Sequence, residues 1–138
     1  MEPELHLRVS ARLVMYKRKI MLNKKIRNYA LSIHYKQRKK RPAFVSGAQY
    51  KPIFKYAKSG DIEVKDFVQS LIVELQAYGN IGEKYRNSSI GYCAEVISCN
   101  RVLQVLPINY SSVNVGVAIR PRTMQIGKRC LICNNLFK

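Results

Sequence analysis

Apolar residues recur at helical spacing through the first forty residues of the chain. The positions that carry this pattern are Leu13, Tyr16, Ile20, Leu22, Ile26, Ala30 and Ile33. Steps of three and four residues place side chains on one face of a helix. The pattern therefore predicts a helix over residues 5–40, with a break along it, that ends before Pro42.

The next segment changes its periodicity twice. Two short apolar runs at 43–47 and 52–57 predict strands on either side of a turn at 47–49. A longer stripe then follows, made of Val64, Phe67, Val68, Leu71, Ile72, Leu75 and Tyr78. It predicts a helix that packs in the core and ends at Gly79. Residues 82–90 are polar and predict a loop.

Three further elements complete the pattern. Residues 91–106 suit a buried helix closed by Pro107, and the apolar run at 113–120 is typical of a covered central strand. Residues 130–137 allow about two helical turns. This order predicts an α/β fold in which helices pack on a small sheet. We expect two parts, a basic helical arm at 1–41 and a domain at 42–138.

The charge of the chain is strongly positive and unevenly distributed. Lys and Arg number 25 against 8 Asp and Glu, a net charge of +17. Residues 1–41 hold thirteen of the basic residues and two of the acids, which gives this part +11. Such a surface favours polyanions through counterion release, which points to nucleic acid, although an acidic protein or an anionic membrane surface would also be attracted. A basic surface without any partner is the simplest alternative.

Segments that would direct the chain to a membrane are not recognisable in the sequence. No run of about 18 apolar residues occurs, so we expect no membrane span. The N-terminal residues lack the basic-then-apolar order of a secretory signal. His6 and His34 both lie in the basic arm, and we expect them to be surface side chains instead of metal ligands.

Three cysteines and one acid form the candidate chemistry. Cys93-Ala94-Glu95 is followed by Cys130 and Cys133, which form a C-x-x-C. Catalytic zinc takes three protein ligands and leaves one position open. Zinc deaminases of nucleobases use three such ligands with a Glu that shuttles protons, in the pattern H-x-E and P-C-x-x-C. Here Cys93 takes the histidine position and Glu95 keeps its offset of two.

This pattern resembles the toxin-type deaminases of bacterial polymorphic toxins, the YwqJ-related type of the cytidine deaminase-like superfamily. In these domains a C-A-E helix, a strand and a C-x-x-C helix recur, and the resemblance covers about residues 91–137. It implies a compact cytidine deaminase-like layered fold with Zn²⁺ on Cys93, Cys130 and Cys133, and Glu95 as the catalytic proton shuttle. It also implies a toxin delivered into the target-cell cytoplasm and a probable partner in the producer, an acidic immunity protein. Two departures are Arg129 in place of proline and the end of the chain five residues after Cys133.

Several side chains near the motif are candidates for contact with the substrate. Tyr92 and Tyr110 are able to stack on a base, or else to pack in the core. The basic candidates are Arg120, Arg122, Lys128 and Arg129. They are able to hold phosphates around an extruded base, or else are solvated charges.

Two alternatives compete with an enzyme. With Cys99 as a fourth ligand, the site would be a closed structural zinc site in a non-catalytic nucleic-acid-binding module. Cys93 and Cys99 are six residues apart, however, so on one helix they point about 120° away from each other. A redox C-x-x-C of the thioredoxin type would leave Cys93 and Glu95 unexplained. The sequence therefore favours a zinc-dependent nucleobase deaminase that acts on DNA or RNA, with cytosine slightly preferred over adenine.

Overall fold

A single long helix, α1 (Pro3–His34), opens the chain. The computed structural model describes residues 3–36 and 41–137, so residues 37–40 of the predicted helix lie outside the described residues. The helix is continuous, and the predicted break is wrong. Its continuity has a simple cause, because residues 4–41 contain neither glycine nor proline.

A β-hairpin of β1 (Val45–Tyr50) and β2 (Ile53–Lys58) follows. The strands pair from Val45 with Lys58 to Tyr50 with Ile53, so the turn lies at residues 51–52, where Lys51 has φ 52°. The predicted turn at 47–49 is therefore wrong. Gly47 lies inside β1, and a Cβ added there would come within 2.9 Å of Ile26 Cγ1. The glycine permits α1 to approach the sheet.

Short strands extend the sheet on the other side of β1. β5 (Asn114–Val115) and β6 (Ile119–Arg120) both pair with β1, and β7 (Gln125–Ile126) pairs with β6. All these pairings are antiparallel, and the order is β2-β1-β6-β7. The predicted strand at 113–120 is thus two strands. Between them the Val117 N–H donates to Asn23 Oδ1 at 3.0 Å, so α1 takes the place of a strand partner.

The remaining helical elements are short, and each predicted helix among them is shorter than predicted. These elements are η2 (Val64–Asp66), α2 (Gln69–Leu75), α3 (Ala94–Val105), η3 (Tyr110–Ser112) and α4 (Leu131–Leu136). The predicted helix at 64–78 is divided because the Asn100 side chain accepts from the Val68 N–H at 2.8 Å and donates to the Asp66 carbonyl at 2.9 Å. The predicted loop at 82–90 contains a small hairpin, β3 (Lys84–Tyr85) and β4 (Ser88–Ser89).

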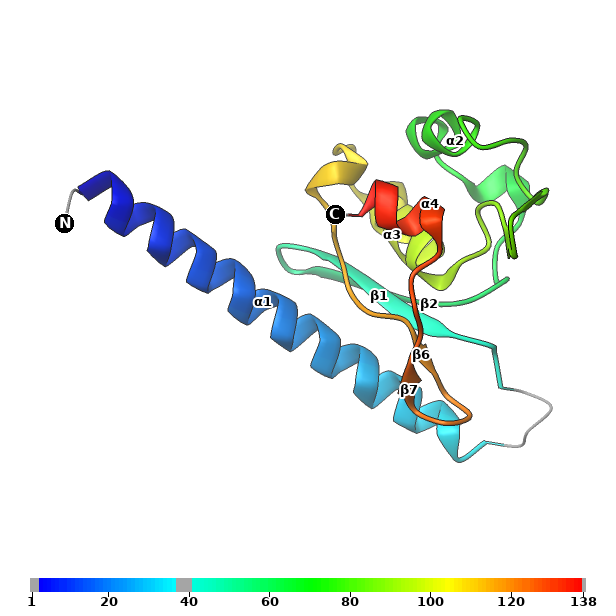
Figure 1. Ribbon diagram of the computed structural model, residues 1–138, viewed down its shortest axis with the longest axis horizontal. Coiled ribbons are helices and arrows are strands. Elements are labelled where there is room, and N and C mark those ends of the chain that lie inside the picture. The colour runs from blue at the N-terminus through cyan, green and yellow to red at the C-terminus, as the bar shows by residue number, and fades with distance from the viewer. Residues whose placement is uncertain (1–2, 37–40, 138) are drawn as a thin grey trace.

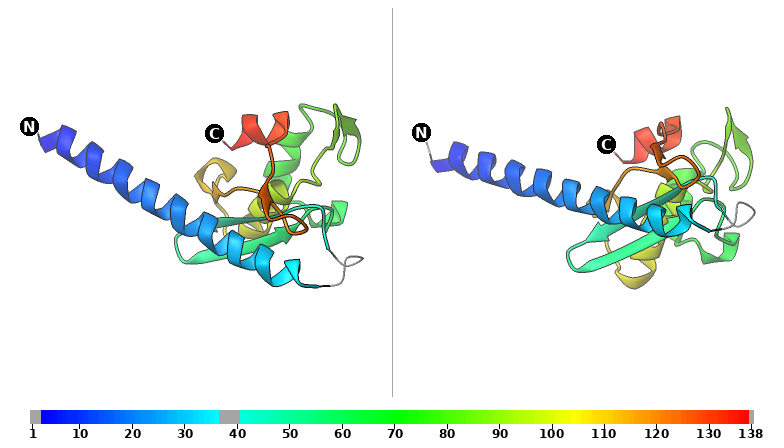
Figure 2. Two further views of the ribbon diagram at one scale, coloured as in Figure 1. Left: turned by 60° about the horizontal axis from the view of Figure 1, so that its bottom comes forward. Right: turned by 90° about the horizontal axis from the view of Figure 1, so that it is seen from below.

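The sheet is covered on both faces. α1 packs on one face through an apolar cluster of Leu22, Ile26, Ala30, Ile33, Val45 and Ile119. On the other face α2, α3 and α4 share a larger core with Ala48 and Val115. Figure 2 shows α1 and α4 on opposite sides of the sheet. The α/β prediction of a small sheet with packed helices is confirmed, and the sheet is antiparallel.

The two halves of α1 differ in their surroundings. Its C-terminal half packs on the sheet, and His34 Nδ1 donates to the Pro121 carbonyl at 2.7 Å. Its N-terminal half extends away from the other elements (Figure 1), and Leu13 and Tyr16 are 53% and 65% exposed. Within residues 3–36 and 41–137, none of the helices has the length and apolarity needed to cross a bilayer.

Candidate metal centre

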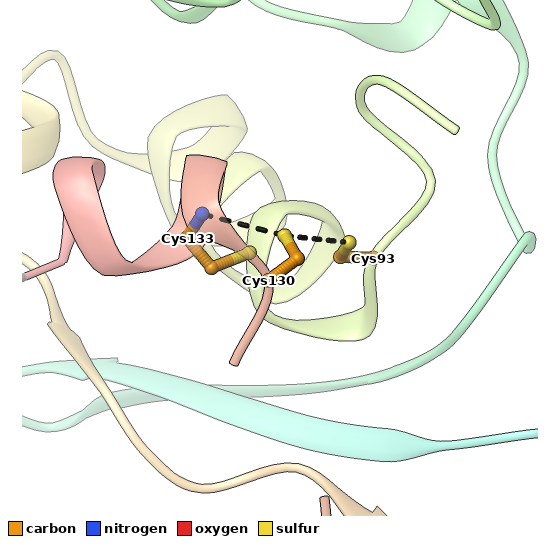
Figure 3. A group of neighbouring side chains, drawn as sticks. All are labelled: Cys93, Cys130 and Cys133. Atoms are coloured by element: carbon orange, nitrogen blue, oxygen red, sulfur yellow. Dashed lines mark hydrogen bonds between the residues drawn. The ribbon is translucent and has the colours of Figure 1, made fainter. Parts of the chain in front are cut away.

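Two helix N-termini bring the three predicted ligands together. Cys93 is the residue that precedes the first turn of α3, and Cys130 holds the same position before α4. Cys133 lies in the first turn of α4, and its N–H donates to Cys130 Sγ at 3.5 Å. Figure 3 shows the three side chains meeting between the two helices. Residues thirty-seven positions apart in the sequence thus become neighbours.

The distances between the sulfurs fit a zinc ion. Cys93 Sγ and Cys130 Sγ are 3.6 Å apart, and all three sulfurs lie within 4.8 Å of one another. Two thiolates that bind one tetrahedral Zn²⁺ at about 2.3 Å are separated by about 3.8 Å. No large movement of the backbone is needed to satisfy this geometry, so the residues present fit the metal that the sequence predicts.

The three cysteines differ in their pKa values. Hydrogen bonds from the Cys133 and Cys93 thiols, with a backbone N–H of Cys133, lower the pKa of Cys130 to about 2. Donation to Cys130 raises the pKa of Cys93 to about 12, and it raises the pKa of Cys133 well above its usual range. The group therefore holds one thiolate and two thiols until a cation displaces the two protons.

Glu95 lies beside the sulfurs and outside the group of potential ligands. It occupies the first turn of α3 and is 5% exposed. Burial raises the pKa of its carboxyl, and the guanidinium of Arg129 opposes that shift, with Nε 3.8 Å from Oε2. A buried carboxyl with a raised pKa is suited to accept a proton and return it.

A cavity of about 320 Å³ opens beside the acid and the sulfurs. Cys93, Glu95 and Cys130 line it, while Cys133 is fully buried. Its other walls come from the segment before β1 (Phe44), the end of β2 (Ser59), the β3–β4 hairpin (Asn87, Ser88, Ser89) and the loop before α4 (Gly127, Lys128). The cavity is therefore large enough for a small planar ligand that would meet both the metal position and Glu95.

Cys99 is separate from the metal group. Its side chain is fully buried in the core formed by α2, α3 and α4. Among the described side chains, the metal group contains Cys93, Cys130 and Cys133 and no fourth cysteine. Burial raises the pKa of Cys99 to about 12. The geometry thus gives no support to a closed four-cysteine site.

The predicted substrate contacts fall in four places. Tyr92 and Lys128 line the cavity. Arg120 does not line it, but its guanidinium lies 5.0 Å from the ring of Phe44, which does. Arg122 is exposed in the turn between β6 and β7 and lines neither of the larger cavities.

Tyr110 and Arg129 line a different cavity, which lies beside α1. The Arg129 guanidinium donates to the carbonyls of Val115 at 2.9 Å, Gly116 at 3.1 Å and Phe137. It therefore joins the end of α4 to β5 while facing Glu95. The arginine that replaces the proline of the pattern has a structural role, and this role could not be predicted from the motif.

Sequence reasoning missed Phe44 and Asn87 as cavity residues. Neither belongs to the motif, and each reaches the cavity from an element whose position depends on the tertiary fold. The only signal at Phe44 is its place at the start of an apolar run, which is shared by most strands.

Comparisons of the chain with protein-family models, with curated proteins and with solved structures give no match.

Proposed function

We propose that the protein is a zinc-dependent deaminase of nucleobases in nucleic acid, with cytosine slightly preferred. The observation that carries the proposal is the placement of a buried acid next to three sulfurs. Cys93, Cys130 and Cys133 are close enough to share one ion, and Glu95 lines the same cavity without joining the ligand group. Three ligands leave one tetrahedral position for water or substrate.

Zinc held by the three sulfurs would lower the pKa of a coordinated water toward about 7. In the overall reaction, water adds to the ring carbon that carries the amine, and ammonia leaves, so that a carbonyl replaces the amine. Glu95 would take one proton from the water and deliver it to the ring nitrogen, and would then move the second proton, from the hydroxyl added to the ring carbon, to the leaving amine. Its burial and the neighbouring Arg129 hold the carboxyl in one position.

The cytidine deaminase-like assignment and the toxin role belong to the same proposal. The order of a C-A-E helix, strand segments and a C-x-x-C helix supports the fold assignment. The net charge of +17 supports a polynucleotide substrate and an acidic immunity protein. Delivery into the cytoplasm of a competing cell rests on the resemblance.

Replacement of Glu95 by glutamine tests the chemistry. Glu95→Gln keeps the size of the side chain and removes the proton acceptor, so we expect deamination to fall by about 10²–10⁴-fold. Zinc content and the melting temperature should stay near those of the wild type. Glu63→Gln is the matched control, because Glu63 is exposed and does not line the cavity, and it should retain activity.

The substrate is best identified inside cells. Expression in bacteria that lack uracil repair, followed by sequencing of genome and transcripts, should give C-to-T changes with the wild type and not with Glu95→Gln. A-to-G changes would move the preference to adenine. Full activity of Glu95→Gln, or zinc held by four protein ligands, would overturn the proposal.

A further inference from the structure

A second cavity, larger than the one at the cysteines, is a groove away from the metal centre. It encloses about 740 Å³ between α1 and the segments η3, β5 and α4. We infer that this groove binds a single-stranded polynucleotide, with its phosphates on the cations of α1 and its bases on tyrosines.

The groove is lined by cations and by no acid. Arg18 and Lys19 contribute from α1 and Arg129 from the opposite side, and no Asp or Glu is found among the described residues that line it. The same helix carries seven exposed Lys and Arg within residues 11–34 and no acid there. Each phosphate that such cations neutralise releases counterions and strengthens binding.

Aromatic and polar side chains complete the groove. Tyr16, from α1, is 65% exposed, and Tyr110 lies in η3 on the facing wall, where it is half-buried against the core. Exposed aromatic rings beside a basic track are the usual platform for unpaired bases. Ser111, Ser112 and Asn114 add hydroxyl and amide groups of the kind that contact phosphates and sugars.

These features favour a single strand over the two other polyanions. In a duplex the bases are stacked on each other, so their faces are not free to contact Tyr16 or Tyr110. An acidic protein segment would use the cations and leave the tyrosines without a specific role. The groove is also distinct from the cavity at the cysteines, because Arg129 lies between them, lining the groove and facing Glu95.

Binding of a fluorescent oligothymidine of twenty nucleotides to the full chain tests the inference. Thymine carries no exocyclic amine, so this probe reports binding whether or not the protein is a deaminase. Arg18→Ala/Lys19→Ala should weaken binding about tenfold at 0.1 M salt. It should also reduce the slope of log K against log salt by about 1.4, the value for two phosphate contacts with a single strand.

The matched control removes the same charge from another face of the helix. Lys24→Ala/Arg27→Ala also loses one Lys and one Arg, both exposed and neither lining the groove. We expect it to weaken binding by less than threefold. Equal losses of affinity in the two double variants would show a diffuse electrostatic effect. This result would overturn the assignment of binding to the groove.

Stacking is tested separately at Tyr16. Tyr16→Leu should weaken binding about tenfold, whereas Tyr16→Phe should stay within twofold of the wild type. Tyr35→Leu is the control, because Tyr35 is 83% exposed just after the end of α1 and lies outside the groove. No effect of Tyr16→Leu would overturn the role given to the aromatic rings.

Competition identifies the ligand class. Unlabelled single strands should displace the probe at lower concentration than a duplex of the same sequence or polyglutamate. Preferential binding of polyglutamate would replace the inference with an acidic protein partner, and preferential binding of the duplex would exclude the stacking arrangement.

Discussion

The two faces of the sheet bury different kinds of side chain. Under α1 the buried side chains are apolar, such as Leu22, Ile26 and Ile119. Under α3 and α4 the chain buries Glu95, Ser98 and Asn100 together with a group of cysteines. Burial of an ionisable group lowers stability unless it is compensated, so such groups mark a candidate functional site. The α1 face stabilises the sheet, and the opposite face holds the candidate metal centre.

Removal of the metal should produce the largest loss of stability. This loss should be confined to the face of the sheet that is covered by α3 and α4. At free zinc a thousandfold above its Kd, binding adds about 4 kcal/mol to the free energy of unfolding. A chelator should remove this increment and expose the amides of α4 to hydrogen exchange, because Cys130 and Cys133 would lose their anchor. The amides of residues 22–33 should keep their protection.

Cys133→Ser should reproduce the chelated state, and Cys99→Ala should retain one zinc per chain. If α4 exchanged hydrogen equally with and without chelator, the prediction that metal stabilises only the face covered by α3 and α4 would be wrong.

Truncation of a buried side chain on the α1 face should lower the free energy of unfolding and leave zinc binding unchanged. Ile26 is fully buried between α1 and the sheet, so Ile26→Ala should lower the free energy of unfolding by about 3 kcal/mol. Zinc content should remain at one per chain. The control is Ile20→Ala on the same helix, where 49% exposure predicts a change within about 0.5 kcal/mol. Urea denaturation of both variants, each with zinc bound, measures the difference.

The accuracy of the sequence predictions also differs between elements. The helix that carries Glu95 was predicted nearly to its bounds, because its apolar stripe and its closing proline are local signals. The three sulfurs meet as the spacing predicts, since each pair of ligands is fixed by its own helix start. The zinc ion, the reaction and its substrate stay predictions.

The elements that were placed wrongly depend on distant side chains. Gly47 was read as a turn residue, although Ile26 of α1 determines the need for glycine there. α2 begins late because Asn100, thirty-two residues after Val68, takes the N–H of Val68. The strand at 113–120 is divided where Asn23 and Arg129 bind its backbone groups. None of these partners is visible in the local pattern.

The smallest effect concerns pH and the core on the face of the sheet that carries the cysteines. Burial raises the pKa of Cys99 from 9.0 to about 12, so above pH 9 the unfolded chain loses this proton and the folded chain keeps it. The free energy of unfolding should therefore fall with rising pH between 9 and 12, by up to about 1.4 kcal/mol per pH unit from this group. In Cys99→Ala the free energy of unfolding should fall less steeply with pH, by the amount that Cys99 contributes. Parallel slopes for the two proteins would show that Cys99 ionises equally in both states.

The contact between α1 and the sheet also restricts which substitutions the chain tolerates during evolution. Ile26 lies against two glycines, Gly47 and Gly116, and a Cβ at either would collide with its side chain. A larger residue at 47 or 116 therefore requires a shorter one at 26, and at 116 Asn23 would also have to move, because its Oδ1 lies 2.7 Å from the added Cβ. In descendants of this sequence the three positions should covary, while the cysteines on the opposite face vary independently of them.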